Sequence, residues 1–338
     1  MEVLLVTGAA GFVGSQFVRT ALEQGYAVIG LDKLTYAGSP DNVAGLPADR
    51  FELVVGDIAD YSLVRSLLER HRPSGVLNFA AESHVDRSIS GPDAFIETNV
   101  LGTMHILRAA SDYHQTLTGG DREGFRFVQI STDEVFGSLG EEGFFTETTP
   151  YAPRSPYSAS KAGADHLASA WHHTYGLPTI VTHCSNNYGP RQHPEKLIPH
   201  MITCALAGKQ LPVYGTGQNI RDWIHVEDHC AGVMVALQRG RVGEHYCFGG
   251  QSEWRNIDLV TQICTILDRI RPRSDKQSYT SQISMVTDRM GHDYRYAIDI
   301  ATATRELDFT PQVTFPEGLA STVEWYLDAS KMRGQDTP

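Results

Sequence analysis

Two adjacent carboxylates, Asp133 and Glu134, occur in the stretch S-T-D-E-V-F-G (131–137), directly after the apolar run F-R-F-V-Q-I (125–130). Two carboxylates one residue apart repel each other, so ionisation of one raises the pKa of the other, and a protonated acid can coexist with an ionised base. Eliminating water β to a ketone needs one base and one acid that reach adjacent carbon atoms. The pair therefore predicts proton-transfer chemistry at the end of a buried strand.

The same stretch has a structural alternative. Ser131 followed by Glu134 matches the S-x-x-E capping box, in which Ser131 is the N-cap and Glu134 occupies the N3 position of a helix. Helix starts are far commoner than catalytic pairs, so the carboxylates alone favour the cap. The motifs described next favour the chemistry, and Ser131 can serve as the cap in either case.

A glycine loop, T-G-A-A-G-F-V-G (7–14), follows the first apolar run and precedes a helix-length segment. Its spacing is G-x-x-G-x-x-G, with Gly8, Gly11 and Gly14. Such glycines let the backbone turn tightly and approach a pyrophosphate, which then meets the positive end of a helix. The alternative is an ordinary tight turn, but the strand before the loop and the helix after it favour a dinucleotide site.

Asp32 closes the second apolar run and supports the same interpretation. A carboxylate there can accept both hydroxyls of an adenine ribose and repels a 2′-phosphate, which favours NAD over NADP. Lys33, the next residue, works against this preference. In G-D-I (56–58), Asp57 is either close to the adenine or simply a turn aspartate, and the sequence leaves both open.

Tyr157 and Lys161 are four residues apart in S-P-Y-S-A-S-K (155–161), and so share one face if the segment is a helix. An ammonium close to a phenol, together with a positively charged nicotinamide ring, favours the phenolate and lowers the pKa of the tyrosine toward neutrality. We therefore predict that Tyr157 is a general base for a sugar hydroxyl. The alternative, an exposed helix pair, is weakened by the glycine loop upstream.

The elements that position these residues alternate between β-branched runs and helical patterns. Helical patterns include F-V-R-T-A-L-E-Q-G, ending at Gly25, and Y-S-L-V-R-S-L-L-E-R-H-R, stopped by Pro73. The alternation predicts an α/β fold with a doubly wound parallel (Rossmann) sheet, whose ligands bind at the carboxyl ends of the strands. The predicted strands are 3–6, 27–31, 51–55, 75–79, 125–130 and 179–184.

After Asn187 the sequence becomes richer in Pro and Gly and less regular in spacing, which predicts a smaller, mixed C-terminal lobe. We predict an NAD-binding domain over 1–186 and a second lobe over 187–338, which the resemblance described below implies to be the substrate-binding (nucleotide-sugar-binding) lobe. Residues 223–238 have helical periodicity, so the segment 220–240 is expected to return to the first domain.

Composition excludes several classes of protein. The chain has 338 residues and a formal net charge of −12, which argues against nucleic acid or an anionic membrane as partner. The five cysteines are scattered without C-x-x-C, as in a reduced cytoplasmic protein. The start M-E-V-L-L-V-T-G lacks the basic residues of a secretory signal, and no run approaches the roughly 18 apolar residues of a membrane span.

Two motifs each allow a structural and a functional interpretation. H-V-E-D-H (225–229) places two histidines at i, i+4, but its acids do not fit the zinc signatures, so we predict no metal. Arg221 is followed by Asp222, which makes a surface ion pair the simple interpretation. The functional alternative is that Arg221 binds a diphosphate, and with Lys196 it offsets the acidic background.

With these motifs in place, the chain resembles the extended short-chain dehydrogenase/reductase superfamily, and S-T-D-E-V-F-G narrows the resemblance to the dTDP-glucose 4,6-dehydratase family. Related epimerases are similar in the glycine loop and Y-x-x-x-K but lack the Asp-Glu pair. The resemblance extends over nearly the whole chain. It includes D-K-L-T-Y-A-G (32–38), A-A-E-S-H-V-D-R-S-I (80–89), C-S-N-N-Y-G-P (184–190), P-E-K-L-I-P (194–199), R-D-W-I-H-V-E-D-H (221–229), D-R-M-G-H-D (288–293) and Y-A-I-D (296–299).

The resemblance implies a role for each catalytic residue. Thr132 hydrogen-bonds the 4-hydroxyl of the sugar while Tyr157, aided by Lys161, removes its proton and C4 gives a hydride to NAD⁺. Glu134 then takes the C5 proton, Asp133 protonates the departing 6-hydroxyl, and the hydride returns to C6. The implied substrate is dTDP-glucose and the implied assembly a homodimer, formed by helices near 95–114 and 155–176, where Ala162, Gly163, Ala168 and Ala170 permit close packing.

The resemblance also implies the binding residues. Cofactor contacts are expected at Gly8, Gly11, Phe12, Val13, Gly14, Asp32, Lys33, Thr35, Asp57, Ile58, Ala80, Ala81, Thr98, Tyr157, Lys161 and Asn187. Substrate contacts are expected at Ser83, Thr132, Asn186, Lys196, Leu197, Pro212, Tyr214, Arg221, Asn256 and His292.

Two residues depart from the family pattern: Phe136 stands where tyrosine is usual and Met290 where proline is common. Two other functions compete with the dehydratase. A nucleotide-sugar 4-epimerase is disfavoured by the Asp133-Glu134 pair. A non-catalytic NAD-dependent binding protein is disfavoured because Thr132, Tyr157 and Lys161 are all present.

Overall fold

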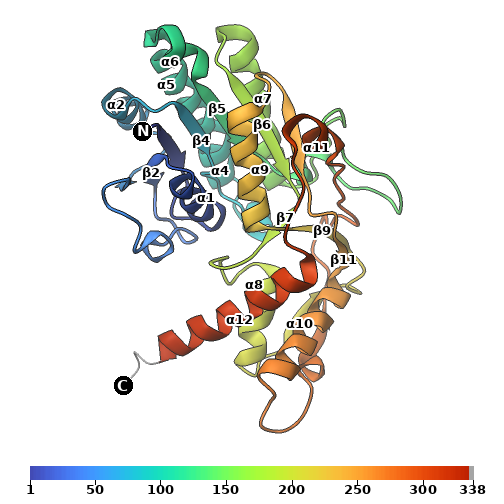
Figure 1. Cartoon of the computed structure of the whole chain (residues 1–338). Coiled ribbons are helices and arrows are strands. Elements are labelled where there is room, and N and C mark those ends of the chain that lie inside the picture. Colours follow the sequence, from blue (N-terminus) through green and yellow to red (C-terminus); the bar gives the residue numbers. More distant parts are fainter. Residues whose placement is uncertain (335–338) are drawn as a thin grey trace.

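The centre of the computed structural model, which describes residues 1–334, is a seven-stranded sheet with the order β10-β6-β5-β4-β1-β2-β3. All of its neighbouring strands are parallel. The α/β class with a doubly wound sheet is therefore confirmed (Figure 1). Its strands are β1 (Val3–Thr7), β2 (Ala27–Asp32), β3 (Phe51–Val55), β4 (Gly75–Asn78), β5 (Arg126–Ile130), β6 (Thr179–Cys184) and β10 (His245–Phe248).

Helices cover both faces of this sheet, because successive residues of a buried strand point to opposite sides. Leu4 and Val6 of β1 lie in an apolar core with α1 (Phe12–Glu23) and α9 (Val226–Arg239). Leu5, between them, lies in a second core on the other face. That core is built from α2 (Tyr61–His71), α5 (Thr103–Thr116) and α7 (Pro156–Tyr175).

The start of α7 fixes the place of Tyr157. Ser155 is the N-cap, its side chain accepts from the backbone N–H of Ser158, and Pro156 occupies the first helical position. Gly176 ends the helix in a left-handed conformation, with φ 70°. Tyr157 therefore lies in the first turn of a well-defined helix, and Lys161 follows one turn later.

A second lobe packs below the carboxyl edge of the large sheet (Figure 1). Its three-stranded sheet has the order β11-β9-β7, and β12 pairs with β8. These strands are β7 (Asn186–Tyr188), β8 (Leu211–Tyr214), β9 (Ile220–His225), β11 (Glu253–Arg255) and β12 (Ile283–Val286). Its apolar core includes residues of α8 (Leu197–Leu206), α10 (Asn256–Ile270) and α12 (Phe315–Gly334).

Shorter helical segments connect these elements. A π-helical segment, Ile96–Gly102, joins α4 to α5 and carries Thr98 into the site. The others are α3 (Val85–Ser90), α4 (Asp93–Phe95), α6 (Gly119–Gly124), α11 (Ala301–Leu307) and the 3₁₀ turns Pro40–Val43, Asp133–Phe136 and Tyr279–Gln282.

The two lobes interleave along the chain. The prediction of helix over 223–238 is wrong for 223–225, which belong to β9 and pair with β7. Trp223 and Ile224 suit a strand, and periodicity does not separate a short apolar strand from a helix. From Val226 the chain is helical and α9 lies on the large sheet, and β10, beyond the predicted returning segment 220–240, forms its edge strand. The division at residues 186 and 187 stays a prediction, to which β10 must be added on the side of the first domain.

None of the helices within residues 1–334 combines the length and apolar character that crossing a membrane requires.

Candidate active site

Two pockets adjoin at the carboxyl edge of the large sheet. The first follows the ends of β1, β2, β4 and β5, and the second lies between this edge and the C-terminal lobe. Residues that line both are Ser83, Glu134, Asn186, Asn187, Gln192, Glu195 and Lys196. The pockets therefore form one continuous cleft, and Glu134 lies at the junction.

The structure brings the predicted site residues together in this cleft. The first pocket is lined by all the residues expected to contact the cofactor, namely Gly8, Gly11, Phe12, Val13, Gly14, Asp32, Lys33, Thr35, Asp57, Ile58, Ala80, Ala81, Thr98, Tyr157, Lys161 and Asn187, and also by Thr132 and Asp133. The second is lined by the expected substrate residues Ser83, Asn186, Lys196, Leu197, Pro212, Tyr214, Arg221, Asn256 and His292. Their individual contacts with ligands stay predictions.

Two glycines of the loop, Gly8 and Gly14, leave no space for a side chain. Gly8 has φ 64°, and a Cβ atom there would lie 2.8 Å from the backbone nitrogen of Ala80. A Cβ atom on Gly14 would lie 2.1 Å from the carbonyl oxygen of Gly8. The helix α1 begins at Phe12 without a side-chain cap. Its first backbone N–H groups are thus available to an anion at the positive end of the helix.

Asp32 is held at the end of β2 by two backbone donors. Its carboxylate accepts from the N–H groups of Ala10 and Leu34, each at 2.8 Å. Lys33 pairs with Asp57 at 2.6 Å, and this hydrogen bond raises the pKa of the lysine. In the sequence, the positive charge of Lys33 argued against a preference for NAD over NADP. The ion pair with Asp57 offsets this charge. Asp57 also accepts from the N–H of Ala59 at 2.9 Å, so it is both a turn aspartate and a residue of the pocket wall.

The capping-box interpretation of Ser131 and Glu134 is wrong. The N-cap of the turn Asp133–Phe136 is Thr132, whose hydroxyl accepts from the N–H of Glu134 at 3.3 Å. Ser131 instead donates to Asp165 at 2.5 Å. The chain stays extended through Thr132, so the cap falls one residue later than the S-x-x-E pattern indicates, and the Glu134 side chain is left to line the cleft.

The two carboxyl groups have different surroundings. Asp133 is 2% exposed, and its Oδ2 has no hydrogen-bond partner among the described residues. Burial raises the pKa of Asp133 well above its ordinary value, and Glu134 and Asp222 raise it further. Burial also raises the pKa of Glu134, but nearby cations oppose the rise, and these are Arg289, Lys196 and Arg221. The arrangement favours a protonated Asp133 beside an ionised Glu134.

The expectation that the pKa of Tyr157 falls toward neutrality is not met in the protein alone. Burial raises the pKa of this phenol well above its ordinary value, and the charges of Glu134 and Asp133 add to the effect. A hydrogen bond with Thr132 acts in the opposite direction. Burial is the largest of these effects and the charge of Glu134 the next, so the phenolate requires further positive charge in the cleft.

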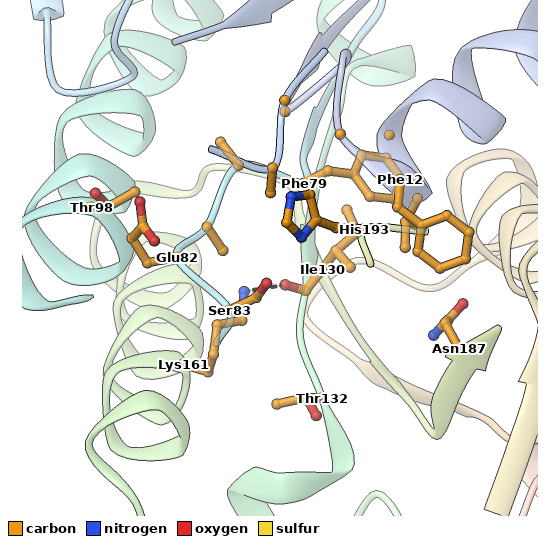
Figure 2. A pocket seen from close by; sticks show the side chains of 18 of the residues that line it. Phe12, Phe79, Glu82, Ser83, Thr98, Ile130, Thr132, Lys161, Asn187 and His193 are labelled. Carbon is orange, nitrogen blue, oxygen red and sulfur yellow. Dashed lines mark hydrogen bonds between the residues drawn. The ribbon is translucent and has the colours of Figure 1, made fainter. Parts of the chain in front are cut away.

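Lys161 points into the first pocket from α7 (Figure 2). Its ammonium donates to the carbonyl oxygen of Ile130, the last residue of β5, at 2.5 Å. Burial lowers the pKa of Lys161, and Asp165 is the first group that opposes this shift. Figure 2 also shows Thr132 at the end of the same strand, across from Asn187.

Arg221 does not form the surface ion pair that its neighbour Asp222 suggested. It is 4% exposed and its guanidinium donates to the carbonyl oxygens of Ile220, Asp293 and Tyr294. The group also lies 4.2 Å from the ring centre of Tyr296. Asp222 accepts instead from the N–H groups of Gly250 and Ser252. The arginine thus projects into the second pocket with backbone carbonyls fixing its plane.

The histidines of H-V-E-D-H have other partners than a metal. His225 caps α9, accepting from the N–H of Glu227. The Nδ1 of His229 lies 2.9 Å from Oδ1 of Asn187, which orients that amide at the junction of the pockets. Burial lowers the pKa of His229 to about 4. Within residues 1–334 no group of three His, Cys, Asp or Glu side chains could hold a metal ion.

Sequence reasoning missed several residues of the cleft. Arg289 lines the second pocket beside Lys196 and Arg221, and Glu195 lines both pockets. Glu195 pairs with Arg87 at 3.3 Å and lies near His84 and His193. Glu82, Gln192, His193 and Tyr296 also line the cleft. Glu195 lies in the motif P-E-K-L-I-P and Arg289 in D-R-M-G-H-D, so these two motifs could have indicated them.

Comparison with known proteins gives a consistent result. Residues 5–322 match the family model described as GDP-mannose 4,6 dehydratase. The chain is 57% identical over 328 residues to the dTDP-glucose 4,6-dehydratase of Xanthomonas campestris pv. campestris (strain ATCC 33913), covering 97% of this chain and 93% of that protein.

Two solved structures are also similar. The dTDP-glucose 4,6-dehydratase of Streptomyces venezuelae, with NAD and TYD bound, matches with a TM-score of 0.88 at 46% identity and 98% coverage of both chains. A UDP-glucose 4-epimerase of Thermotoga maritima with UDP-glucose matches with a TM-score of 0.85 at 26% identity, covering 97% of this chain and 99% of that one.

Proposed function

We propose that this chain, which belongs to the dTDP-glucose 4,6-dehydratase family, converts dTDP-glucose to dTDP-4-keto-6-deoxyglucose and water. The observation that carries the proposal is the position of the carboxylate pair. Asp133 and Glu134 follow β5 at the junction of a dinucleotide pocket with a pocket that contains cationic side chains. A sugar at this junction can reach a redox cofactor and an acid–base pair at once.

The proposed cofactor is NAD, as in the solved relative from Streptomyces venezuelae. The residues fit it, because the uncapped start of α1 can receive a pyrophosphate and Asp32 can accept ribose hydroxyls. When bound, NAD⁺ would accept the hydride from C4 of the sugar and return it to C6 in the same turnover. Its nicotinamide would also bring the positive charge that the Tyr157 phenol needs.

The catalytic side chains then divide the proton transfers among them. Tyr157 takes the proton of the 4-hydroxyl, which Thr132 hydrogen-bonds, as C4 becomes a ketone. Glu134 removes the proton from C5, and Asp133 gives a proton to the oxygen on C6, so that the C6–O bond breaks and water leaves. Glu134 returns its proton to C5 when C6 is reduced, so the sugar loses one water molecule in sum. Tyr157 then holds one extra proton and Asp133 lacks one, and exchange with solvent restores both for the next turnover.

The nucleotide is proposed to bind in the second pocket. Lys196, Arg221 and Arg289 provide positive charge near its junction with the first, which suits a diphosphate. Asn256 and His292 lie further along the same wall. The choice of thymidine rests on the relatives, because these side chains do not by themselves distinguish one base from another.

The epimerase alternative is disfavoured by the carboxylate pair. The fold alone does not separate the two reactions, since a UDP-glucose 4-epimerase shares it. An epimerase needs only oxidation and reduction at C4, whereas elimination of water needs an acid and a base near C5 and C6. The buried Asp133 and the cation-flanked Glu134 meet that need.

Mass spectrometry distinguishes these functions directly. Incubated with dTDP-glucose and NAD⁺, the protein should form a 4-keto-6-deoxy sugar lighter than the substrate by one water. UDP-glucose and GDP-mannose serve as competing substrates in parallel incubations. Conversion without a change of mass would indicate epimerisation, and a preference for GDP-mannose would contradict the proposed nucleotide.

Metal removal should leave the activity unchanged. The carboxylates and the tyrosine do all the proton transfers, and among the described residues no group of three His, Cys, Asp or Glu side chains could hold a metal ion. Exhaustive chelation followed by the mass assay checks this prediction, and loss of activity that only added zinc restores would contradict it.

Because the hydride leaves and returns in one turnover, NAD should also copurify with the protein.

A homodimer is proposed through the outer face of the π-helical segment, α5 and α7. Ile96 and Leu101 are each 45% exposed there, and Tyr175 is 56% exposed. The predicted role of the small residues is partly wrong, because Ala162 and Ala168 pack inside the chain.

Sedimentation should give twice the chain mass at micromolar concentration. Replacing Leu101 with lysine should weaken the dimer, and a native monomer would contradict the proposal.

The five cysteines are unpaired, which supports the cytoplasmic location that we propose.

A further inference from the structure

Asp165 lies one helical turn beyond Lys161 on α7, and the proposed chemistry does not use it. Residues four apart on a helix share a face, so Tyr157, Lys161 and Asp165 form a row along α7. Asp165 is 0% exposed and Lys161 is 5% exposed. Two buried charged groups of opposite sign on one helix face call for a physical reason, because each is costly to remove from water.

The ammonium of Lys161 needs a nearby negative charge to remain protonated. Its hydrogen bond to the Ile130 carbonyl oxygen is to a neutral group. Among the charges that raise the pKa of Lys161 against burial, Asp165 comes first and Cys184 second. Burial raises the pKa of the Cys184 thiol to about 12, so this group is neutral near pH 7. Asp165 is therefore the anion available to Lys161.

The carboxylate of Asp165 is fixed by donors from two other segments. Its Oδ2 accepts from Oγ of Ser131 at 2.5 Å and from the Tyr151 hydroxyl at 3.2 Å. Ser131 directly precedes Thr132, Asp133 and Glu134 in the chain. Asp165 thus joins the helix that carries Tyr157 and Lys161 to the strand end that carries the other catalytic residues.

Among the groups that shift the pKa of Asp165, Lys161 is the only cation. The Tyr151 hydroxyl lies 3.3 Å from Nε2 of His183, and the same nitrogen lies 3.1 Å from His245. Burial lowers the pKa of His183 well below its ordinary value and also lowers that of His245. Burial raises the pKa of Asp165 to about 7, with Lys161 first among the groups that oppose the rise.

We propose that Asp165 is a positioning residue for the oxidation at C4, the buried counter-charge that keeps Lys161 protonated beside Tyr157. The inference rests on the proposed function, in which Tyr157 must lose its proton. Without this carboxylate the buried ammonium would lose its proton more readily, and a neutral lysine cannot stabilise a phenolate. Asp165 touches neither sugar nor cofactor and acts only through Lys161.

The substitution Asp165→Asn tests the negative charge of the carboxylate separately from the shape of the side chain. The amide oxygen can still accept from Ser131 and Tyr151, so the packing is kept while the negative charge is lost. The ionisation of Tyr157 is followed as tyrosinate ultraviolet absorbance against pH in the NAD complex, with Tyr157→Phe subtracted. The midpoint should rise by about one pH unit, and NADH formation from dTDP-glucose near neutral pH should fall by about tenfold. The loss should diminish at higher pH.

Two further variants make the result specific. Tyr113→Phe removes a different buried tyrosine hydroxyl, which donates to the carbonyl oxygen of Pro73, and its tyrosinate midpoint should equal that of the native protein. In a Lys161→Met background, Asp165→Asn should cause no additional shift, because the charge acts through the lysine. An unchanged midpoint in Asp165→Asn, or an equal shift with and without Lys161, would overturn the proposal.

Folding and function can be separated from this result. If Asp165→Asn fails to fold, Lys161→Met combined with Asp165→Asn should fold, because both buried charges are then absent. Failure of that double variant as well would overturn the counter-charge assignment. The titration requires no turnover, so a native protein that binds NAD but forms no keto sugar contradicts the proposed function and leaves the test of Asp165 readable.

Discussion

Replacing Tyr157 with phenylalanine should slow the oxidation at C4 by on the order of 10²–10⁴-fold, because the 4-hydroxyl loses its general base. The substitution removes one oxygen and keeps the ring, which lies edge-on to Phe95 with 6.3 Å between ring centres. The fold should therefore be preserved. Nucleotide binding should also be preserved, because the cations of the second pocket are unchanged.

Stopped-flow absorbance of the reduced cofactor measures this step in a single turnover. Tyr113→Phe is a matched control, since it also removes a buried tyrosine hydroxyl, one that donates to the carbonyl oxygen of Pro73, but lies outside both pockets. The control should form reduced cofactor at close to the native rate. If Tyr157→Phe did so too, another group would be the base and the role assigned to Tyr157 would be wrong.

The pH dependence of this step follows from the environment of Tyr157. Burial and the nearby Glu134 and Asp133 raise the pKa of the phenol in the protein alone. A group that must lose its proton to act gives a rate that rises with pH through its pKa. Binding of a positively charged nicotinamide lowers that pKa, so the midpoint for oxidation in the NAD complex should lie below the midpoint of tyrosinate formation without NAD.

The strands of the large sheet were predictable because their apolar runs are bounded by turn residues. All six strands predicted in the first domain agree with the structure to within one residue at each end. The edge strand β10 was not predicted. Its sequence H-Y-C-F is short, and it joins the sheet only because α9 brings the chain back to that edge.

The site was recognisable from motifs, but its electrostatics were not. The Tyr157–Lys161 spacing indicates a helix face, whereas the pKa of Tyr157 depends on Glu134 and on burial, which only the folded chain determines. Arg221 shows the same limit of local reasoning. Its neighbour in sequence is Asp222, yet the two side chains bind different groups on either side of β9.

The partners of Ser131 illustrate long-range competition with a local pattern. The S-x-x-E spacing is a valid capping signature, but Asp165 on α7 provides a charged acceptor for the Ser131 hydroxyl. Thr132 then becomes the cap. Asp165 lies 34 positions later in the chain, so no window around 131–137 contains the information.

Glu134→Gln should reduce product formation by roughly 10²–10⁴-fold, because an amide cannot accept the C5 proton as a carboxylate does. The fold should tolerate the change. The N–H of Glu134, not its side chain, makes the contact with Thr132 that begins the turn. Melting temperature and the sedimentation coefficient, compared with those of the native protein, check that the variant is folded.

Oxidation at C4 should survive in Glu134→Gln, since Tyr157 and Lys161 are unchanged. The variant should therefore accumulate reduced cofactor beside an unreacted ketone, visible as a persistent NADH absorbance. Removing the negative charge near Tyr157 also lowers the pKa of the phenol, so the first step should not be slower than in the native protein.

Asp133→Asn should stall at a different point, and the contrast assigns the two roles. Its amide is a far poorer proton donor to the departing hydroxide, so water loss slows, but Glu134 can still remove the C5 proton. In deuterated water Asp133→Asn should exchange deuterium into C5 of the substrate and Glu134→Gln should not. Exchange in Glu134→Gln alone would reverse the assignment. Near-native turnover in Glu134→Gln would show that the pair has no acid–base function. The reason to prefer a dehydratase over an epimerase on this fold would then be lost.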